Sequence, residues 1–362
     1  MNHAARLARV RERMGELGVD ALCCSVGPDL PYLTGYAAMP LERLTMLVVR
    51  REGDDAALVV PRLEVPRVDD AVGIFSVEPW EETEDPIARV ATHLDGATTV
   101  AIGDQTWARF VLSLQEALPG ARFVPASDVT GPLRAVKDPE EVDRLRAAAH
   151  AVDGIAADMR GRPFVGRTEH DVHREIVERI LDAGHERVNF AIVASGPNAA
   201  SPHHDPGSRV IEPGDVVLCD FGGTMDGYCS DITRMYVAGE PAAEVRDAYT
   251  ALVIAQEAAV VAATVGTTCE TVDAAARDVL ADAGLADRFV HRTGHGIGMD
   301  AHEDPYVVEG NTTALVPGHA FSIEPGVYVP GRFGLRLEDI VVASTDGPVR
   351  LNDAPRDLAV VA

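Results

Sequence analysis

The chain has 362 residues, of which 46% are hydrophobic and 25% are charged, a balance typical of folded globular proteins rather than disordered ones. Its length favours about two domains. The formal net charge of −25 argues against nucleic acid or an anionic membrane as a partner, and no run reaches the ~20 apolar residues that a membrane-spanning helix needs.

The first 125 residues alternate between helical and strand-like patterns. Leu7, Val10 and Met14 lie at helical spacing and predict a helix over residues 4–17. Two apolar runs separated by Gly53-Asp54-Asp55 predict a β-hairpin. Further elements are expected as a strand at 19–26, a turn at 27–31, a strand at 98–102, a helix at 107–118 and a strand at 123–125. This alternation predicts an α/β domain over residues 1–135.

A second domain is expected from residue 136 to residue 362. Asp138 can cap a helix whose first residue is Pro139, and Thr168 can cap another over 169–183. Further helices are expected at about 242–264 and 269–283. Between them lie short strands and Gly/Pro turns, which together predict an α+β architecture.

Two aspartates border a predicted hairpin in this second domain. An apolar strand, residues 216–218, leads to Asp220, and Asp231 begins the return strand. The turn residues Gly222-Gly223 and Asp226-Gly227 are expected to reverse the chain and bring the two carboxylates to facing positions. Two carboxylates inside an apolar hairpin repel each other unless they are protonated or neutralised. A divalent metal ion is the simplest way to neutralise them.

Three further residues complete the set of candidate ligands. His295 lies in the glycine-rich stretch 294–298, Glu324 ends an apolar strand before Pro325, and Glu338 lies on a strand of alternating pattern. Four carboxylates and one imidazole suit Mn²⁺, Co²⁺, Fe²⁺ or Zn²⁺. They suffice for two metal ions, which would make water nucleophilic and stabilise a tetrahedral intermediate.

The ordered series Asp220, Asp231, His295, Glu324 and Glu338 resembles that of the pita-bread metallopeptidases of family M24, which include aminopeptidase P, prolidase and methionine aminopeptidase. The resemblance spans the C-terminal half of the chain. The N-terminal region, with its Tyr-Leu-Thr-Gly-Tyr stretch at 32–36, is similar to the creatinase-type domain of aminopeptidase P and prolidase. Methionine aminopeptidases lack that domain.

The resemblance implies a role for each ligand. Asp220 would bind one metal ion, His295 and Glu324 the other, and Asp231 and Glu338 would bridge the two. Glu324 would also act as the general base. Mn²⁺ is the expected metal.

The resemblance also implies a set of residues that contact the substrate. His203 and His302 correspond to catalytic histidines, with His204 as a weaker substitute for His203. His291 corresponds to a residue near the substrate. Arg336 is expected to orient metal ligands or to meet a substrate carboxylate, and Tyr306 is also placed among the substrate-binding residues.

The reaction expected from the resemblance is hydrolysis of the first peptide bond of short peptides. Some prolidases have an arginine after the His-Glu-x-Pro stretch that binds the carboxylate of a dipeptide, but here Tyr306 follows Pro305. This departure favours Xaa-Pro aminopeptidase activity and leaves dipeptidase activity as the alternative. A metal-independent creatinase-like hydrolase or a silent peptide-binding module would lack several metal ligands, whereas all five are present.

Family members are commonly dimers, so a homodimer is expected. The five cysteines have irregular spacing and predict no disulfide framework, and no secretory signal is recognised over residues 1–20. A cytoplasmic location is therefore expected.

Overall fold

The computed structural model describes residues 2–53, 55–68 and 73–362. The chain separates into two compact units, one running to Arg134 and the other from Ala135 to Ala362.

The first unit is built on a six-stranded mixed sheet of order β4-β3-β2-β1-β5-β6. Its strands are β1 (Ala21–Cys24), β2 (Met46–Arg50), β3 (Ala56–Pro61), β4 (Ser76–Trp80), β5 (Thr99–Ile102) and β6 (Arg122–Pro125). Its α-helices are α1 (His3–Leu17), α2 (Asp29–Thr34), α3 (Pro86–His93), α4 (Ala108–Ala117) and α5 (Ser127–Ala135), which extends one residue into the second unit. The hairpin expected from the two apolar runs is confirmed, because β2 and β3 pair antiparallel; Asp54, in its turn, lies outside the described residues.

Helices α2 and α5 of this unit were not expected from the sequence. The stretch 27–31 contains the start of helix α2, since prolines are tolerated in a first helical turn, where backbone N–H groups have no intrahelical acceptor. The strand expected at 123–125 is confirmed as β6, and the helix α5, which was not expected, follows it. That helix contains Gly131 and Pro132, whose low helix propensity concealed it in the sequence.

The helices of the second unit begin where their capping residues predict. Asp138 and Glu141 form a reciprocal capping box at the start of α6 (Pro139–Met159). Thr168 does the same for α7 (Glu169–Asp182). The other two long helices are α8 (Ala243–Ala262) and α9 (Cys269–Asp282), as expected.

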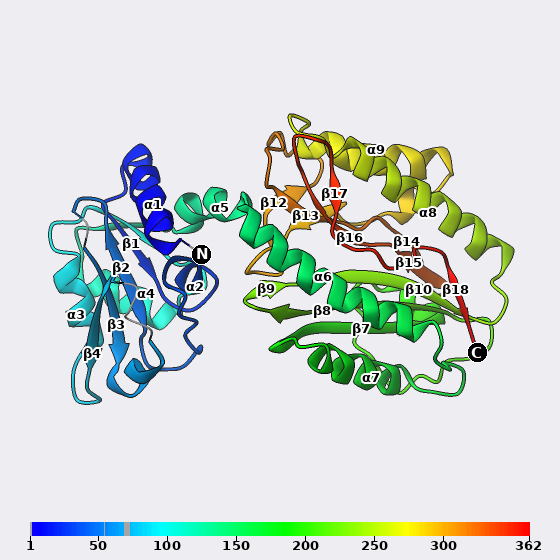
Figure 1. Ribbon diagram of the computed structural model, residues 1–362, viewed down its shortest axis with the longest axis horizontal. Helices are drawn as coiled ribbons and strands as arrows, with labels where there is room; N and C mark the ends of the chain where they lie inside the picture. The colour runs from blue at the N-terminus through cyan, green and yellow to red at the C-terminus, as the bar shows by residue number, and fades with distance from the viewer. Residues whose placement is uncertain (1, 54, 69–72) are drawn as a thin grey trace. The chain divides into compact units, whose positions relative to one another are not determined.

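Two sheets and a two-stranded ribbon lie between these helices (Figure 1). The first sheet has the order β18-β10-β8-β7, with β9 paired to β8, and the second has the order β12-β11-β13-β16-β17. Their strands are β7 (Arg187–Ser195), β8 (Val216–Met225), β9 (Tyr228–Cys229), β10 (Ile232–Ala238), β11 (Gly294–Gly296), β12 (Glu303–Val307), β13 (Ala320–Ile323), β16 (Asp339–Val342), β17 (Val349–Arg350) and β18 (Ala359–Val361). The ribbon pairs β14 (Gly326–Val329) with β15 (Phe333–Arg336).

The helices pack on the sheets in two pairs, α6 with α7 and α8 with α9. Apolar residues of α6 and α7 form a buried core with β7, β8 and β10, and those of α8 and α9 form another with β10, β13 and β16. The isolated bridge between Thr233 and Glu338 joins the two halves. The structure therefore supports the ligand-bearing strand ends from both sides with packed helices.

The hairpin that carries the two aspartates differs from the expected one. Gly222 and Gly223 lie inside β8, and the chain turns at Asp226 and Gly227, whose φ angles are 48° and 80°. Glycine is needed at 222 because a Cβ there would collide with the Ser230 carbonyl. Register places Asp220 opposite Thr233 rather than opposite Asp231. Since side chains alternate along a strand, Asp231 and Thr233 share a face, and the two aspartates are diagonal neighbours.

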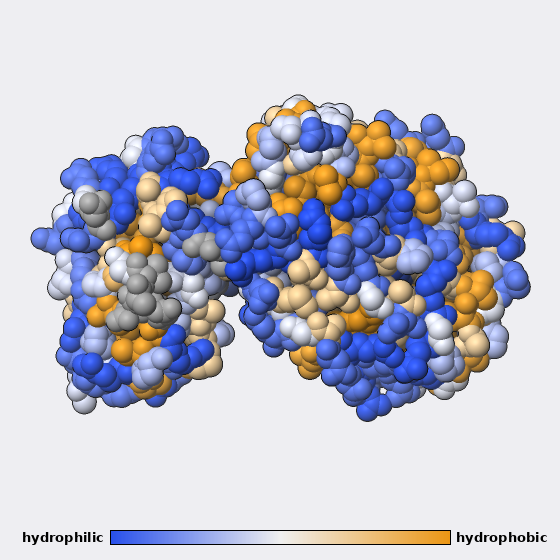
Figure 2. Space-filling model, viewed as in Figure 1, coloured by the Kyte–Doolittle hydropathy of each residue, from blue (hydrophilic) through white to orange (hydrophobic). Residues whose placement is uncertain are grey.

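The surface of the second unit is strongly polar around α7, whose outward residues include Arg174, Glu178 and Asp182. Figure 2 shows hydrophilic residues gathered over this helix on the visible face. No helix among the described residues is both long and apolar enough to span a membrane.

Candidate metal and peptide site

The sequence-predicted residues converge on one cavity of the second unit, with a volume of about 1040 Å³. All five predicted metal ligands line it, together with three predicted substrate or proton-transfer histidines and Arg336. These residues are His203, Asp220, Asp231, His291, His295, His302, Glu324, Arg336 and Glu338. Tyr306 is the one predicted site residue that does not line the cavity.

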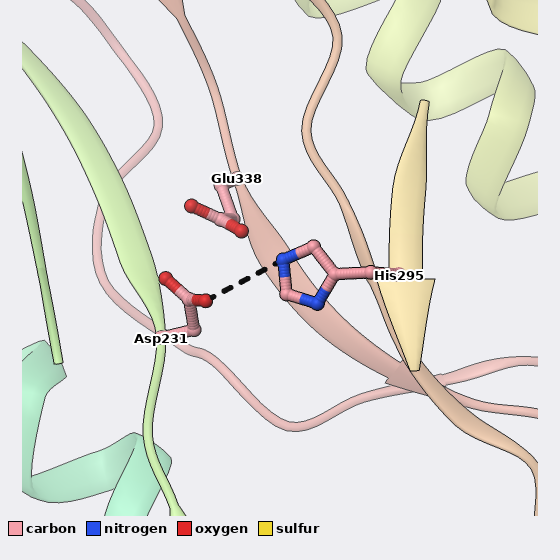
Figure 3. Close-up of side chains that lie close together, drawn as sticks. All are labelled: Asp231, His295 and Glu338. Carbon is pink, nitrogen blue, oxygen red and sulfur yellow. Dashed lines mark ion pairs between the residues drawn. The ribbon is translucent and has the colours of Figure 1, made fainter. Parts of the chain in front are cut away.

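Asp231, His295 and Glu338 form the tightest cluster of possible ligands. Each offers one ligand atom, and the three atoms lie within 4.8 Å of one another. Figure 3 shows the three side chains pointing toward a common centre, with His295 Nε2 3.8 Å from Asp231 Oδ2. All three residues are buried, so an ion held here would be largely removed from water.

Glu324 and Asp220 lie beside this cluster. Glu324 Oε1 is 3.3 Å from His295 Nε2. Asp220 forms an ion pair with Arg336, whose Nε also lies 4.0 Å from Glu324 Oε2. Arg336 is fixed by further hydrogen bonds from Nε to Thr233 and from Nη1 to Tyr328 and the Pro202 carbonyl. Arg336 therefore lies against two of the predicted metal ligands.

The electrostatics of the cluster favour a cation. Burial and the neighbouring carboxylates, Asp220 first, raise the pKa of Asp231 well above its usual range. Burial and Asp231 do the same to the pKa of Glu338, and burial raises the pKa of Glu324 to about 7. Two buried carboxylate oxygens, Oδ1 of Asp220 and Oδ1 of Asp231, accept no hydrogen bond from the described residues. A divalent cation would satisfy these oxygens and stabilise the ionised carboxylates, so the donor set fits hard divalent ions.

The tautomer of His295 suits metal binding. Its Nδ1 lies 3.1 Å from the Gly296 carbonyl, which can only accept, so Nδ1 carries the proton and Nε2 presents a lone pair to the carboxylates. Burial and His302 lower the pKa of His295 to about 3, which keeps the ring neutral. The His302 ring packs edge-on against it, with 4.0 Å between ring centroids.

The adjacent histidines 203 and 204 have different surroundings. His203 is exposed and lines the cavity. His204 Nε2 instead lies 2.9 Å from the buried carboxylate of Glu169, at the start of α7. Glu169 also accepts hydrogen bonds from Ser195, Asn198 and Gly207. These bonds fix the position of the loop that carries both histidines. Sequence reasoning missed Glu169, because a capping-turn glutamate gives no sign of such distant partners.

His291 and Tyr306 occupy different places. His291 Nε2 lies 2.8 Å from the Tyr328 hydroxyl, which can donate to it while accepting a hydrogen bond from Arg336. Burial lowers the pKa of His291 to about 4. Tyr306 reaches the cavity only through Arg292, whose guanidinium lies 4.5 Å above its ring and which does line the cavity. Arg292 and Tyr328 were also missed by sequence reasoning, although Arg292 is only three residues before His295.

Comparisons with known proteins identify the family of this chain. Residues 143–345 match the model of metallopeptidase family M24, and residues 6–136 match the creatinase/prolidase N-terminal domain. The first match alone covers more than half of the chain. The chain belongs to metallopeptidase family M24.

Relatives of this M24 chain match it along nearly its whole length. A probable dipeptidase, PepE of Mycobacterium tuberculosis, is 46% identical over 99% of this chain and 96% of its own. The Xaa-Pro dipeptidase of Lactobacillus helveticus is 33% identical over 92% of each chain. The solved prolidase of Thermococcus sibiricus is 35% identical, with a TM-score of 0.93 over 100% of both chains.

These findings confirm three expectations. The chain is an M24 metallopeptidase, it has a creatinase-type N-terminal domain, and its catalytic region has the pita-bread fold. Its family implies divalent metal ions, and the cluster of Asp231, His295 and Glu338 is suited to hold one. The individual roles of the site residues, the metal used and the oligomeric state stay predictions.

Proposed function

We propose that this M24 enzyme is a dipeptidase that uses two divalent metal ions, most simply Mn²⁺, and that Xaa-Pro dipeptides are its principal substrates. The observation that carries the proposal is the convergence of three buried carboxylates, one half-buried carboxylate and one neutral imidazole on a single cavity. The relatives' names, a probable dipeptidase and an Xaa-Pro dipeptidase, favour a dipeptide over the longer peptides of an aminopeptidase P. The proposal thus takes the second of the two specificities that the sequence left open.

Five residues would hold the metal ions: Asp220, Asp231, His295, Glu324 and Glu338. Asp231 and Glu338 would be shared by the two ions, because burial and the neighbouring carboxylates raise the pKa of each and bound positive charge would favour their ionised forms. When bound, the ions would supply Lewis acidity that activates water and polarises the scissile carbonyl. Co²⁺, Fe²⁺ and Zn²⁺ would also suit these donors.

The chain's own residues would orient the substrate and move protons. Glu324 would accept the proton of the attacking water, since burial already favours proton binding at this carboxylate. The exposed His203 and His302, on the cavity wall, would contact the scissile peptide and help to protonate the departing amine. His291 would hold a substrate group near the hydroxyl of Tyr328.

The test uses a matched pair of substrates, an Xaa-Pro dipeptide and the corresponding Xaa-Pro-Xaa tripeptide. Each is incubated with metal-stripped enzyme before and after Mn²⁺ is added. We expect Mn²⁺ to restore cleavage of the dipeptide and to give much slower cleavage of the tripeptide. Faster cleavage of the tripeptide would instead establish the aminopeptidase P-like specificity, and cleavage without metal would favour a creatinase-like hydrolase. A homodimer and a cytoplasmic location remain companion predictions, which sedimentation and fractionation can test.

A further inference from the structure

Lys137 is the one lysine among the 32 lysine and arginine residues of the chain. It is buried in the second unit, where its Nζ lies 2.6 Å from Oε1 of Glu303, and the two side chains are 1% and 8% exposed. A buried ion pair is a poor source of stability, because the loss of hydration offsets the attraction between the charges. A lysine used once, in such a place, indicates a need for a compact ammonium group that the bulkier arginine would not meet.

The backbone around Lys137 is fixed to the segment that leads into β13. The Lys137 N–H donates to the Gly318 carbonyl at 2.8 Å, and Val136 forms an isolated β-bridge with His319. A Cβ at Gly318, whose φ is 94°, would lie 2.6 Å from the Lys137 carbonyl, so the two segments are in close contact. The ammonium group therefore extends from a part of the chain that is already held in place.

The other member of the pair, Glu303, is the first residue of β12 and follows His302 directly. Its backbone pairs with β11, and residues 297–302 connect the two strands. Gly298, in this connection, has no room for a side chain, because a Cβ there would collide with Glu303 Oε1 and lie 3.0 Å from Lys137 Cε. The ion pair therefore packs directly against the backbone of the loop that ends in His302.

The His302 side chain is exposed on the cavity wall, with its ring edge-on to that of His295 at 4.0 Å between centroids. An exposed ring on a loop takes its position mainly from the backbone that carries it. The adjacent Glu303 is buried and held by Lys137. A displacement of Glu303 would therefore move His302 relative to His295 and the cavity.

We propose that Lys137 is a positioning residue, which acts through Glu303 to hold His302 where it can protonate the departing amine. The inference rests on the role proposed for His302 in dipeptide hydrolysis. It gives the buried ion pair a function in catalysis that does not require either member to touch the substrate.

The experiment is a double-mutant cycle between Lys137 and His302. Hydrolysis of an Xaa-Pro dipeptide is measured for the Mn²⁺-loaded wild type, Lys137→Met, His302→Ala and the double variant. We expect Lys137→Met to lower kcat by about 10- to 100-fold, as displacement of a catalytic group by about 1 Å does, with KM and bound Mn²⁺ nearly unchanged. In the His302→Ala background the same substitution should lower kcat by less than about 2-fold, since the group that it misplaces is already absent.

A second variant covers the case in which Lys137→Met is too unstable to assay, because it leaves Glu303 buried without its ammonium partner. Lys137→Met combined with Glu303→Gln removes both charges, and it should give the same loss of kcat and the same dependence on His302. Arg160→Met is the matched control. It removes the cationic partner of Asp357, outside the cavity lining, and should leave kcat unchanged in both backgrounds.

A readout that is independent of activity uses metal-free protein labelled with ¹³C-histidine. The NMR signal of His302 is the one that disappears in His302→Ala, and it should shift in Lys137→Met but not in Arg160→Met. An unmoved His302 signal, or a full loss of kcat from Lys137→Met in the His302→Ala background, would overturn the inference alone. A fully active His302→Ala enzyme would overturn both the inference and the role of His302. If wild type does not cleave the dipeptide, the proposed function fails, and the His302 signal decides the role of Lys137 by itself.

Discussion

At the scale of single residues, adjacent side chains in this site have unlike roles. His203 and His204 cannot be told apart by composition, yet only one is held by a buried carboxylate, since His204 lies 2.9 Å from Glu169. The resemblance to the M24 peptidases identified His203 as the candidate for the chemistry. The structure supplies a physical reason to separate the two: one ring is exposed on the cavity wall, and the other anchors its loop.

Substitution of these neighbours should therefore have different effects. We expect His203→Asn to lower kcat by about 100-fold or more with an unchanged free energy of unfolding, because a proton-transfer group is lost. His204→Asn should lower the free energy of unfolding by about 1–3 kcal/mol, because it weakens a hydrogen bond to a buried carboxylate. Steady-state kinetics and urea unfolding of both variants check this. Equal loss of stability in the two variants would contradict the assignment.

At the scale of elements, the site depends on how helices and strands hold short loops. The N-terminus of α7 supplies Glu169, whose carboxylate accepts backbone and side-chain donors from the loop after β7. A glutamine at position 169 would keep the shape of the side chain, but its amide N–H groups would face other hydrogen-bond donors instead of accepting from them. The loop that carries His203 would then lose its fixed position.

We expect Glu169→Gln to lower kcat/KM by about 10- to 100-fold, since displacement of a catalytic group by about 1 Å has effects of this size. Bound metal should remain at the wild-type level, because no predicted ligand lies on the loop. Glu178→Gln, on the exposed face of the same helix, is the matched control and should change little. Loss of metal from Glu169→Gln would show that the loop does more than position His203.

Alanine substitutions at two glycines should have opposite effects on the stability of the protein. A Cβ at Gly294, on β11, would collide with the Ser322 carbonyl of β13, so Gly294→Ala should destabilise the fold by about 1–3 kcal/mol and reduce metal affinity by displacing His295. A Cβ at Gly154, inside α6, would meet no atom within 4 Å. Gly154→Ala should therefore stabilise the protein by up to about 1 kcal/mol. Thermal unfolding and metal content measure both effects, and a stable, metal-binding Gly294→Ala enzyme would refute the packing argument.

At the scale of the whole molecule, the acidic site is a source of instability that metal should reverse. The carboxyl of Glu324 has a pKa raised from 4.5 to about 7, so the folded metal-free protein binds this proton more tightly than the unfolded chain does. The contribution of Glu324 to the free energy of unfolding is fully present below pH 4.5 and is lost as the pH rises to 7. The half-buried His291, whose pKa is lowered to about 4 by desolvation, contributes the opposite slope in this range.

A variant comparison isolates the carboxylate from the histidines. In chelator-treated protein, Glu324→Gln should be more stable than wild type at pH 8, by up to about 3 kcal/mol for a shift of this size, and nearly equal at pH 5. With excess Mn²⁺ the order at pH 8 should reverse, because only wild type keeps the full ligand set. Denaturant unfolding at the two pH values measures these differences. A metal-free wild type that is the more stable protein at pH 8 would contradict the expectation.

The sequence alone determined those features that depend on local patterns. Asp138 and Thr168 mark helix starts, because a capping side chain acts within three residues. Asp220, Asp231, His295, Glu324 and Glu338 were identified as an ordered set at strand ends and turns, and one cavity is lined by all five. The M24 family and its two-domain architecture followed from these residues and their surroundings.

Only the tertiary structure decided which distant groups meet. The diagonal placement of Asp220 and Asp231 depends on strand register. The Glu169 carboxylate accepts hydrogen bonds from residues up to 38 positions away in the sequence. Arg336 pairs with Asp220, from which it is separated by 116 positions. The Arg292 guanidinium over the Tyr306 ring likewise joins the segment before β11 to strand β12. Such contacts are selected by packing of the whole chain rather than by neighbours in sequence, so local patterns cannot reveal them.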